Sequence, residues 1–218
     1  MNESRRRGSY AVGRKRRDRI VAAAAEQFAT AGYAHTSMTR VAQEAGITAT
    51  GLLHYFPSKQ HLLLAVAEHR FDVAAALVDS AADVEGDGDA LFDALLAVTR
   101  RFVAEPGLIE LFVTLSAEAA DPSSAAHELF AARYERTVGE LTARFRACAR
   151  GGSFRTDVDY EAVARECVAI SDGLQLQWVL SGRSTDLLAG IGLHLARLRE
   201  TLRPAGVAAD APGLPGRR

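Results

Sequence analysis

A short polar stretch at residues 48–55 carries the side chains best suited to contacting a nucleic acid. Thr48 is a favourable helix N-cap, and its hydroxyl could also reach a phosphate at the helix N-terminus. Thr50 offers a hydroxyl to a base edge and a methyl group to a thymine methyl. Gly51 would let the backbone approach DNA closely, and His54 on the same face could bond a base or a phosphate. These residue types and spacings predict a helix that reads base edges in duplex DNA.

Polar residues on either side of this stretch are expected to hold the DNA backbone, because phosphate contacts fix the register of a bound duplex. The expected backbone contacts are Arg14, Arg16, Thr36, Thr39, Arg40, Tyr55 and Lys59. Other roles stay open for several residues. Thr36 and Thr39 could be plain helix caps, and Tyr55 could pack against the first helix with only its hydroxyl exposed. Gly51 could be merely a weak helical position, and His54 a solvated surface histidine.

Charge is distributed unevenly along the chain. Residues 1–60 contain ten Lys and Arg and four Asp and Glu, a net charge of +6, whereas the remaining residues have a net charge of −7. This asymmetry is typical of a nucleic-acid-binding module joined to another domain. The arginines at 5–7 and the basic run at 14–17 could follow the phosphate backbone or enter a minor groove. They could also form a solvated basic tail.

The surrounding elements are predicted to be helices, because apolar residues recur at spacings of three and four almost throughout. A first helix would end at Gly32, and residues 38–45 and about 48–56 would form two short helices. Gly46 can adopt the left-handed turn conformation between these two, and Ala42 lets them approach closely. Further helices are expected to begin near Lys59, Asp89, Leu108, Ser124, Val158 and Ser184, with Asp89 as a cap. The chain is therefore expected to be all-α, with about nine helices.

The segment 14–66 resembles the DNA-binding domain of the TetR family of transcriptional regulators. The matching residues are Phe28, Gly32, Thr36, Val41, Ala42, Ala45, Gly46, Ile47, Thr48, Leu52, Tyr55, Phe56, Ser58, Lys59 and Leu62. Weaker matches follow at 115–119, at Asp159 and at 172–178. Leu53 stands where the family often has Tyr, and Ala49-Thr50 also departs from the family pattern. The resemblance therefore implies the fold without implying the operator sequence.

The resemblance implies an all-helical dimer with an N-terminal helix-turn-helix DNA-binding domain and a C-terminal ligand-binding and dimerisation domain. The expected divisions are a disordered basic arm (1–13), the DNA-binding domain (14–60, with the helix-turn-helix motif at 37–56), the ligand-binding and dimerisation domain (61–203) and a disordered tail (204–218). The implied function is sequence-specific DNA binding by a transcriptional regulator, most often a repressor released from its operator by a small-molecule effector. The competing interpretation is a protein-interaction module of helix-turn-helix shape that binds no operator.

The C-terminal part needs a role of its own. By the resemblance, helices at about 158–181 and 184–203 would pair with their copies in a homodimer, although their apolar faces could also be intrachain core. The candidate lining residues of an effector pocket are Phe71, Phe102, Phe112, Tyr134, Gln175 and Trp178. Aromatic residues at helical spacing are, however, more often core. Glu118 follows an apolar run and could be buried, in which case it would need a ligand cation or a structural arginine as partner.

Other classes of protein have little support in the sequence. The motifs GxSxG, GxxxxGK[ST], HExxH and GxGxxG do not occur, and the six histidines lack metal-ligand spacing, so no catalytic residue, metal or cofactor is expected. An all-helical enzyme without these motifs is the alternative. The two cysteines form no CxxC pair, which fits a reducing cytoplasm. No stretch approaches the roughly 18 apolar residues of a membrane span. The expected partners are therefore double-stranded operator DNA, a second copy of the chain and an unidentified effector, in the cytoplasm.

Overall fold

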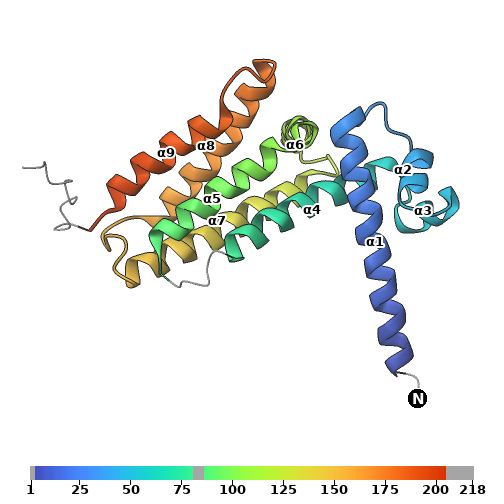
Figure 1. Ribbon diagram of the computed structural model, residues 1–218, viewed down its shortest axis with the longest axis horizontal. Helices are drawn as coiled ribbons and strands as arrows, with labels where there is room; N and C mark the ends of the chain where they lie inside the picture. The colour runs from blue at the N-terminus through green and yellow to red at the C-terminus, as the bar shows by residue number, and fades with distance from the viewer. Residues whose placement is uncertain (1–2, 81–85, 205–218) are drawn as a thin grey trace, which may run out of the picture.

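The computed structural model describes residues 3–80 and 86–204, and this part of the chain contains nine α-helices and no strand (Figure 1). The helices are α1 (Glu3–Ala31), α2 (Met38–Glu44), α3 (Ala49–Tyr55), α4 (Lys59–Ser80), α5 (Gly88–Val103), α6 (Pro106–Glu118), α7 (His127–Arg150), α8 (Tyr160–Leu180) and α9 (Leu187–Leu202). The prediction of an all-α protein with an N-terminal helix-turn-helix is confirmed.

A small apolar core joins the first three helices. Ile20 and Phe28 of α1 are almost completely buried, as are Val41 of α2 and Leu52 of α3. Gly46 connects α2 and α3 with φ = +66°, a left-handed conformation that costs glycine little, so the predicted turn is confirmed. The backbone N–H of Ile47 then donates to the carbonyl oxygen of Ala42 within α2 at 2.9 Å, which closes the turn of the helix-turn-helix.

The expected disorder of residues 1–13 is wrong for the part that is described, because α1 begins at Glu3. No proline interrupts this stretch, and the two glycines, Gly8 and Gly13, each cost a helix only about 1 kcal/mol relative to alanine. The first half of α1 consequently projects beyond the body of the molecule (Figure 1). The expected disordered tail falls almost entirely on residues 205–218, which lie outside the described residues.

The helix α4 runs from the helix-turn-helix end of the molecule into the bundle of later helices (Figure 1). Its first half buries Leu62 and Val66 in the same apolar cluster as α1, α2 and α3. Its second half carries Arg70 and Phe71 to a cavity among the later helices. Residues of α6 and the start of α7 complete the first cluster, so packing continues across the position where a domain boundary is expected. The division between residues 60 and 61 stays a prediction.

A second apolar cluster holds α5, α7, α8 and α9 together around Phe92, Phe145 and Leu195. Aspartates begin three of its helices, because a carboxylate oxygen accepts the free backbone N–H groups of a first turn. The cap of α5 is Asp87, which accepts from the N–H groups of Asp89 and Ala90, so the expectation that Asp89 is the cap is wrong. The helix begins one residue earlier, at Gly88, which places Asp89 inside the first turn.

None of the helices in the described part has both the length and the apolar character needed to cross a bilayer.

Candidate DNA-binding surface and effector cavity

The helix α3 presents an exposed polar face. Thr48 caps it as predicted, with its hydroxyl oxygen 3.0 Å from the N–H of Gly51. Thr50 and His54 are exposed together with Leu53, whose side chain is 48% accessible. This arrangement leaves two hydrogen-bonding side chains and one apolar side chain free to meet a groove of DNA.

Gly51 has a structural reason to lack a side chain. A β-carbon at this position would lie 3.1 Å from the hydroxyl oxygen of Thr48, which is tighter than ordinary contact. The glycine therefore leaves room for the cap that begins the helix. Close approach of its backbone to DNA stays a prediction.

Four of the residues expected to contact phosphates have exposed side chains. They are Arg14 and Arg16 on α1 and Thr39 and Arg40 on α2. Their role at the DNA backbone stays a prediction. The side chains of the arginines at 5–7 lie outside the described part of the structure.

Thr36 does not have the exposure that a phosphate contact needs. Its side chain is 3% exposed, and its hydroxyl lies within hydrogen-bond distance of the carbonyl oxygens of Gly32, at 2.9 Å, and Gln27, at 3.2 Å. The threonine thus ties the end of α1 to the loop before α2. The helix cap of α2 is the next residue, Ser37, whose oxygen accepts from the N–H of Arg40. The expected phosphate contact of Thr36 is therefore wrong.

Tyr55 and Lys59 are half-buried, between α3 and the loop that precedes α2. The ammonium of Lys59 lies 4.3 Å from the centroid of the Tyr33 ring and donates to the carbonyl oxygen of Ala34 at 3.4 Å. Tyr55 packs against the first apolar cluster, to which α1 contributes, and its alternative role of packing on the first helix stays open. Lys59 thus already has partners within the protein, and phosphate contacts of both residues stay predictions.

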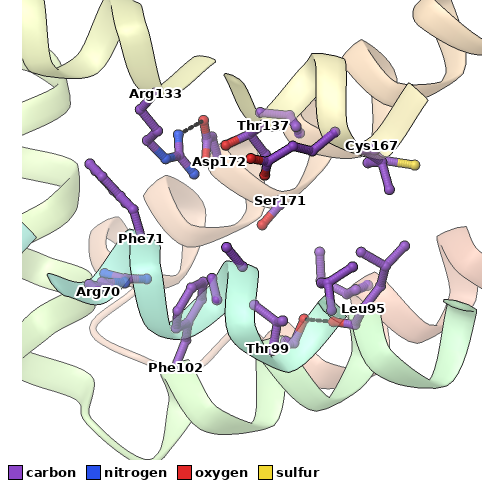
Figure 2. A pocket seen from close by; sticks show the side chains of 18 of the residues that line it. Arg70, Phe71, Leu95, Thr99, Phe102, Arg133, Thr137, Cys167, Ser171 and Asp172 are labelled. Atoms are coloured by element: carbon purple, nitrogen blue, oxygen red, sulfur yellow. Dashed lines mark hydrogen bonds and ion pairs between the residues drawn. The ribbon is translucent and has the colours of Figure 1, made fainter. Parts of the chain in front are cut away.

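A cavity of about 140 Å³ lies among α4, α5, α7, α8 and α9, with Phe112 of α6 also in its lining (Figure 2). Four of the six aromatic and amide residues expected at a pocket line it. They are Phe71, Phe102, Phe112 and Gln175. The walls also include aliphatic side chains, among them Val78, Leu95 and Ile191. Most of the lining is apolar, with a few polar groups at defined points, which is typical of a small-molecule site.

Three residues expected at the pocket lie elsewhere. Trp178 belongs to the second apolar cluster and is covered by Arg183, whose guanidinium carbon is 5.4 Å from the indole ring. Glu118 is exposed at the end of α6 and accepts from the hydroxyl of Ser124 at 3.2 Å, so the suggestion that it could be buried is wrong. Tyr134 stands behind the lining, where its hydroxyl donates to Asp172 at 2.6 Å.

The sequence analysis missed the most deeply buried charge of the cavity, Arg70 on α4. Its guanidinium donates to the carbonyl oxygen of Leu108 at 2.6 Å and to the side-chain oxygen of Gln175 at 2.7 Å. Burial, together with the nearby charge of Arg133, lowers the pKa of Arg70 to about 9. Because this pKa remains above neutrality, the group is charged at pH 7. A charged residue in phase with Val66 on an otherwise apolar helix face was the available signal.

Arg133 of α7 and Asp172 of α8 form the second charged feature of the cavity. The two side chains are 3.8 Å apart and only slightly exposed. Burial raises the pKa of Asp172, while Arg133 and the hydroxyl of Tyr134 oppose the shift. Burial also raises the pKa of Tyr134 to about 12, together with the hydrogen bond to Asp172. Figure 2 shows Arg70, Phe71, Phe102 and Arg133 at one end of the cavity and Leu95 and Cys167 at the other.

The outer faces of α8 and α9 expose large apolar side chains. Leu176 is 45% exposed, Leu180 76% and Leu193 54%. These are three of the five large hydrophobic residues that are exposed within the described ranges. Such a concentration on two neighbouring helices is typical of a surface that another protein covers. No group of three or more His, Cys, Asp or Glu in the described ranges could hold a metal ion.

The fold and the exposed α3 define a helix-turn-helix DNA-binding regulatory protein. The family model described as bacterial regulatory proteins, tetR family, matches residues 20–66. The model described as BetI-type transcriptional repressor, C-terminal, matches residues 88–202, which is more than half of the chain. The chain therefore belongs to the TetR family of transcriptional regulators, which is a family of regulators and not of enzymes.

Individual relatives support the same assignment. The HTH-type transcriptional regulator RutR of Escherichia coli (strain K12) is 38% identical over 65 residues, and this match covers 30% of each chain. The chain thus spans 30% of the length of the curated relatives it matches.

Solved structures match over most of their length. A TetR transcription regulator from Haloarcula marismortui has a TM-score of 0.69 and 25% identity, over 86% of this chain and 98% of that one. A putative regulator from Saccharomonospora viridis, solved with choline, has a TM-score of 0.65 and 22% identity, over 84% and 95%. Thermus thermophilus FadR, solved with lauroyl-CoA, has a TM-score of 0.60 and 20% identity, over 92% and 100%. The last two identities establish the shared fold alone.

Proposed function

We propose that this protein binds operator DNA as a homodimer, represses transcription there, and is released when a small molecule occupies the cavity. The observation that carries the proposal is α3, which is capped by Thr48 and exposes Thr50, Leu53 and His54 on one face. A helix of this kind enters the major groove with its N-terminal residues against the base edges. Exposed Arg14, Thr39 and Arg40 would then contact the flanking phosphates, and the cytoplasm is the proposed location.

The proposed homodimer follows from the need for two such helices. A two-fold dimer would place two copies of α3 at half-sites about one helical turn apart, or a multiple of it. The exposed Leu176, Leu180 and Leu193 support pairing of α8 and α9 with their copies, because this contact would remove three large apolar side chains from water.

The proposed effector response is a population shift. An effector that binds more tightly to a dimer whose α3 helices are wrongly spaced for DNA would lower operator affinity. Bound operator would weaken effector binding by the same coupling free energy. Two observations support a small-molecule effector here: the largely apolar cavity, and the choline and lauroyl-CoA seen in two proteins of the same fold.

Fluorescence anisotropy tests DNA binding directly. The labelled duplex would carry the region upstream of the protein's own gene, and a scrambled duplex would be the control. We expect sequence-selective binding that weakens steeply as salt rises, because basic groups displace counterions from DNA. Thr50→Ala/His54→Ala should remove the selectivity, whereas the control Thr156→Ala, in an exposed loop after α7, should not. Absence of binding at low salt would contradict the proposal and favour a protein-interaction module.

A further inference from the structure

The buried end of the cavity holds more positive than negative charge. Arg70 is 7% exposed, and both of its hydrogen-bond acceptors, the Leu108 carbonyl and the Gln175 amide oxygen, are neutral. Among the residues that the structure describes, Asp172 is the one carboxylate that forms an ion pair with Arg70 or Arg133, and it lies against the slightly exposed Arg133. The end formed by these three residues therefore carries one uncompensated positive charge, which is costly away from water.

The aromatic side chains of this end already have cations over their rings. The guanidinium carbon of Arg70 lies 3.9 Å from the ring centroid of Phe102 and 4.8 Å from that of Phe112. That of Arg133 lies 4.7 Å from the Phe71 centroid and 4.9 Å from the Phe112 centroid. A ligand ammonium bound by these aromatic rings would need the same ring faces for a cation–π contact. Here it would compete with two arginines and be repelled by them.

One buried donor in this end makes no hydrogen bond. The Nη1 atom of Arg133 faces Oδ2 of Asp172 at 3.8 Å, which is beyond hydrogen-bond distance. A buried donor without an acceptor is expensive, and a charged one especially so. A ligand carboxylate would supply an acceptor and a compensating charge at once, in the geometry that guanidinium groups favour. The Oδ1 atom of Asp172 also has no hydrogen-bond partner, so it could accept a hydrogen bond from an N–H or O–H group of the same ligand.

The rest of the cavity is suited to an apolar body. Its walls beyond the arginines are formed by side chains such as Ala74, Val78, Leu95, Val98 and Ile191. Further charged or titratable side chains line the part away from Arg70 and Arg133. They are Arg144, which is paired with Asp79, the exposed Arg136 and Glu140, and the half-buried His194. A ligand that fits would therefore have an anionic head at Arg70 and Arg133 and a hydrocarbon portion along α4, α5 and α9.

We propose that the effector is a small organic acid whose carboxylate is bound by Arg70 and Arg133 and whose apolar body fills the cavity. This inference rests on the proposed function, because it names the class of effector at the same site. It excludes a quaternary ammonium compound, although a protein of the same fold was solved with choline.

Three probes of one shape and different charge test the proposal: phenylpropionate, phenylpropionamide and phenylpropylammonium, with octanoate as an aliphatic acid. The readouts are thermal unfolding and isothermal titration calorimetry on the full-length protein without DNA. We expect an acid to raise Tm by roughly 5 °C at about 100 times its Kd, and the amide and the ammonium to bind at least about tenfold more weakly. Stabilisation by the ammonium in preference to the acids, or by none of the four probes, would overturn the inference.

Two substitutions with opposite expected effects on acid affinity test where the carboxylate binds. Arg133→Gln should weaken acid binding about tenfold or more, because it removes a charged hydrogen bond. Asp172→Asn should instead strengthen it, because it removes the negative charge that competes for Arg133. The matched control is Arg146→Gln, at an exposed position of α7 outside the cavity lining. If Arg133→Gln does not fold, Arg133→Lys keeps the charge and should weaken binding less than tenfold. Weaker acid binding in Asp172→Asn would overturn the proposed site.

Operator binding separates this inference from the function on which it rests. Anisotropy without any probe measures DNA binding alone. Intact operator binding with no acid bound would overturn the effector class and leave the DNA-binding proposal standing. Acid binding by a protein that does not bind its operator would overturn the DNA-binding proposal and leave the anion site standing.

Discussion

Gly107, in the first turn of α6, lies directly against the backbone of Ala29 near the end of α1. A β-carbon on Gly107 would be 2.3 Å from the carbonyl oxygen of Ala29, so only glycine allows this approach. The next residue of α6 is Leu108, whose carbonyl oxygen accepts from Arg70 in the cavity. The cavity and the helix that supports the DNA-binding surface are therefore joined by one short path of direct contacts.

We expect Gly107→Ala to push α1 and α6 apart. The substitution should lower the free energy of unfolding by about 1–3 kcal/mol, as overpacking of a close contact does, and change operator affinity. Urea unfolding and DNA anisotropy measure the two effects. The control is Gly139→Ala in α7, where a β-carbon meets nothing within 4 Å. Alanine there should be neutral or stabilising by up to about 1 kcal/mol. Equal effects of the two substitutions would contradict the close contact.

Thr48→Ala removes the cap of α3. We expect a loss of about 1 kcal/mol in the free energy of unfolding and weaker operator binding, because the first-turn N–H of Gly51 loses its acceptor. Thr48→Ser keeps a hydroxyl in the same place and should retain most of both properties. Chemical unfolding measured alongside anisotropy checks the pair. A serine variant as impaired as the alanine variant would argue against capping as the role of Thr48.

Leu180→Glu and Leu193→Glu should convert a dimer to a monomer. Each places a carboxylate on the exposed apolar faces of α8 or α9, where pairing of two copies would bury it without a partner. Light scattering after size exclusion gives the mass of the particle. Operator affinity should fall by about a hundredfold or more, since a monomer loses the second half-site. Val103→Glu, at an exposed position on α5, is the control and should stay dimeric.

The buried Asp172 should make the protein less stable as pH rises. Its pKa is raised above the ordinary value of 3.8 by burial, so the folded state binds the proton more tightly than the unfolded state. This contribution is fully present below pH 3.8 and is lost as pH rises through the folded pKa. The free energy of unfolding of wild type should therefore fall relative to Asp172→Asn between about pH 3 and 7, as measured by urea unfolding.

Asp157 supplies a control of opposite sign for this pH series. Its hydrogen bonds with Arg155 lower its pKa to about 2. The stability that the ionised carboxylate contributes is present above pH 3.8 and is lost as pH falls toward 2. The free energy of unfolding of wild type should therefore rise relative to that of Asp157→Asn as pH rises over this range. Two aspartates that changed in the same direction would contradict the different causes assigned to them.

Features set by neighbouring residues could be predicted well. The nine helices, the cap at Thr48 and the left-handed turn at Gly46 follow from spacing, capping and backbone conformation over a few residues. Predictions were wrong where two nearby residues could each take the same role, as Asp87 and Asp89 could each cap α5. The helix at residues 3–13 was missed because basic composition outweighed the absence of a strong helix breaker.

The candidate site was predicted only in part, for a different physical reason. The exposure of Thr50 and His54 follows from the periodicity of one short helix. Burial of Thr36 and exposure of Glu118 depend on which neighbouring element covers each position, and apolar runs do not identify that neighbour. Four pocket residues were found because large apolar side chains on several helices tend to meet inside a bundle.

By itself, the sequence determined the helices, the turn between α2 and α3 and the polar residues that α3 exposes, because these depend on interactions within one or two helical turns. The tertiary structure alone decided the charge of the cavity. It brought Arg70 within hydrogen-bond distance of Gln175, which is 105 residues away, and set Arg133 against Asp172. Hydrophobic burial is non-directional, so a helical pattern indicates which face is buried without indicating what lies opposite.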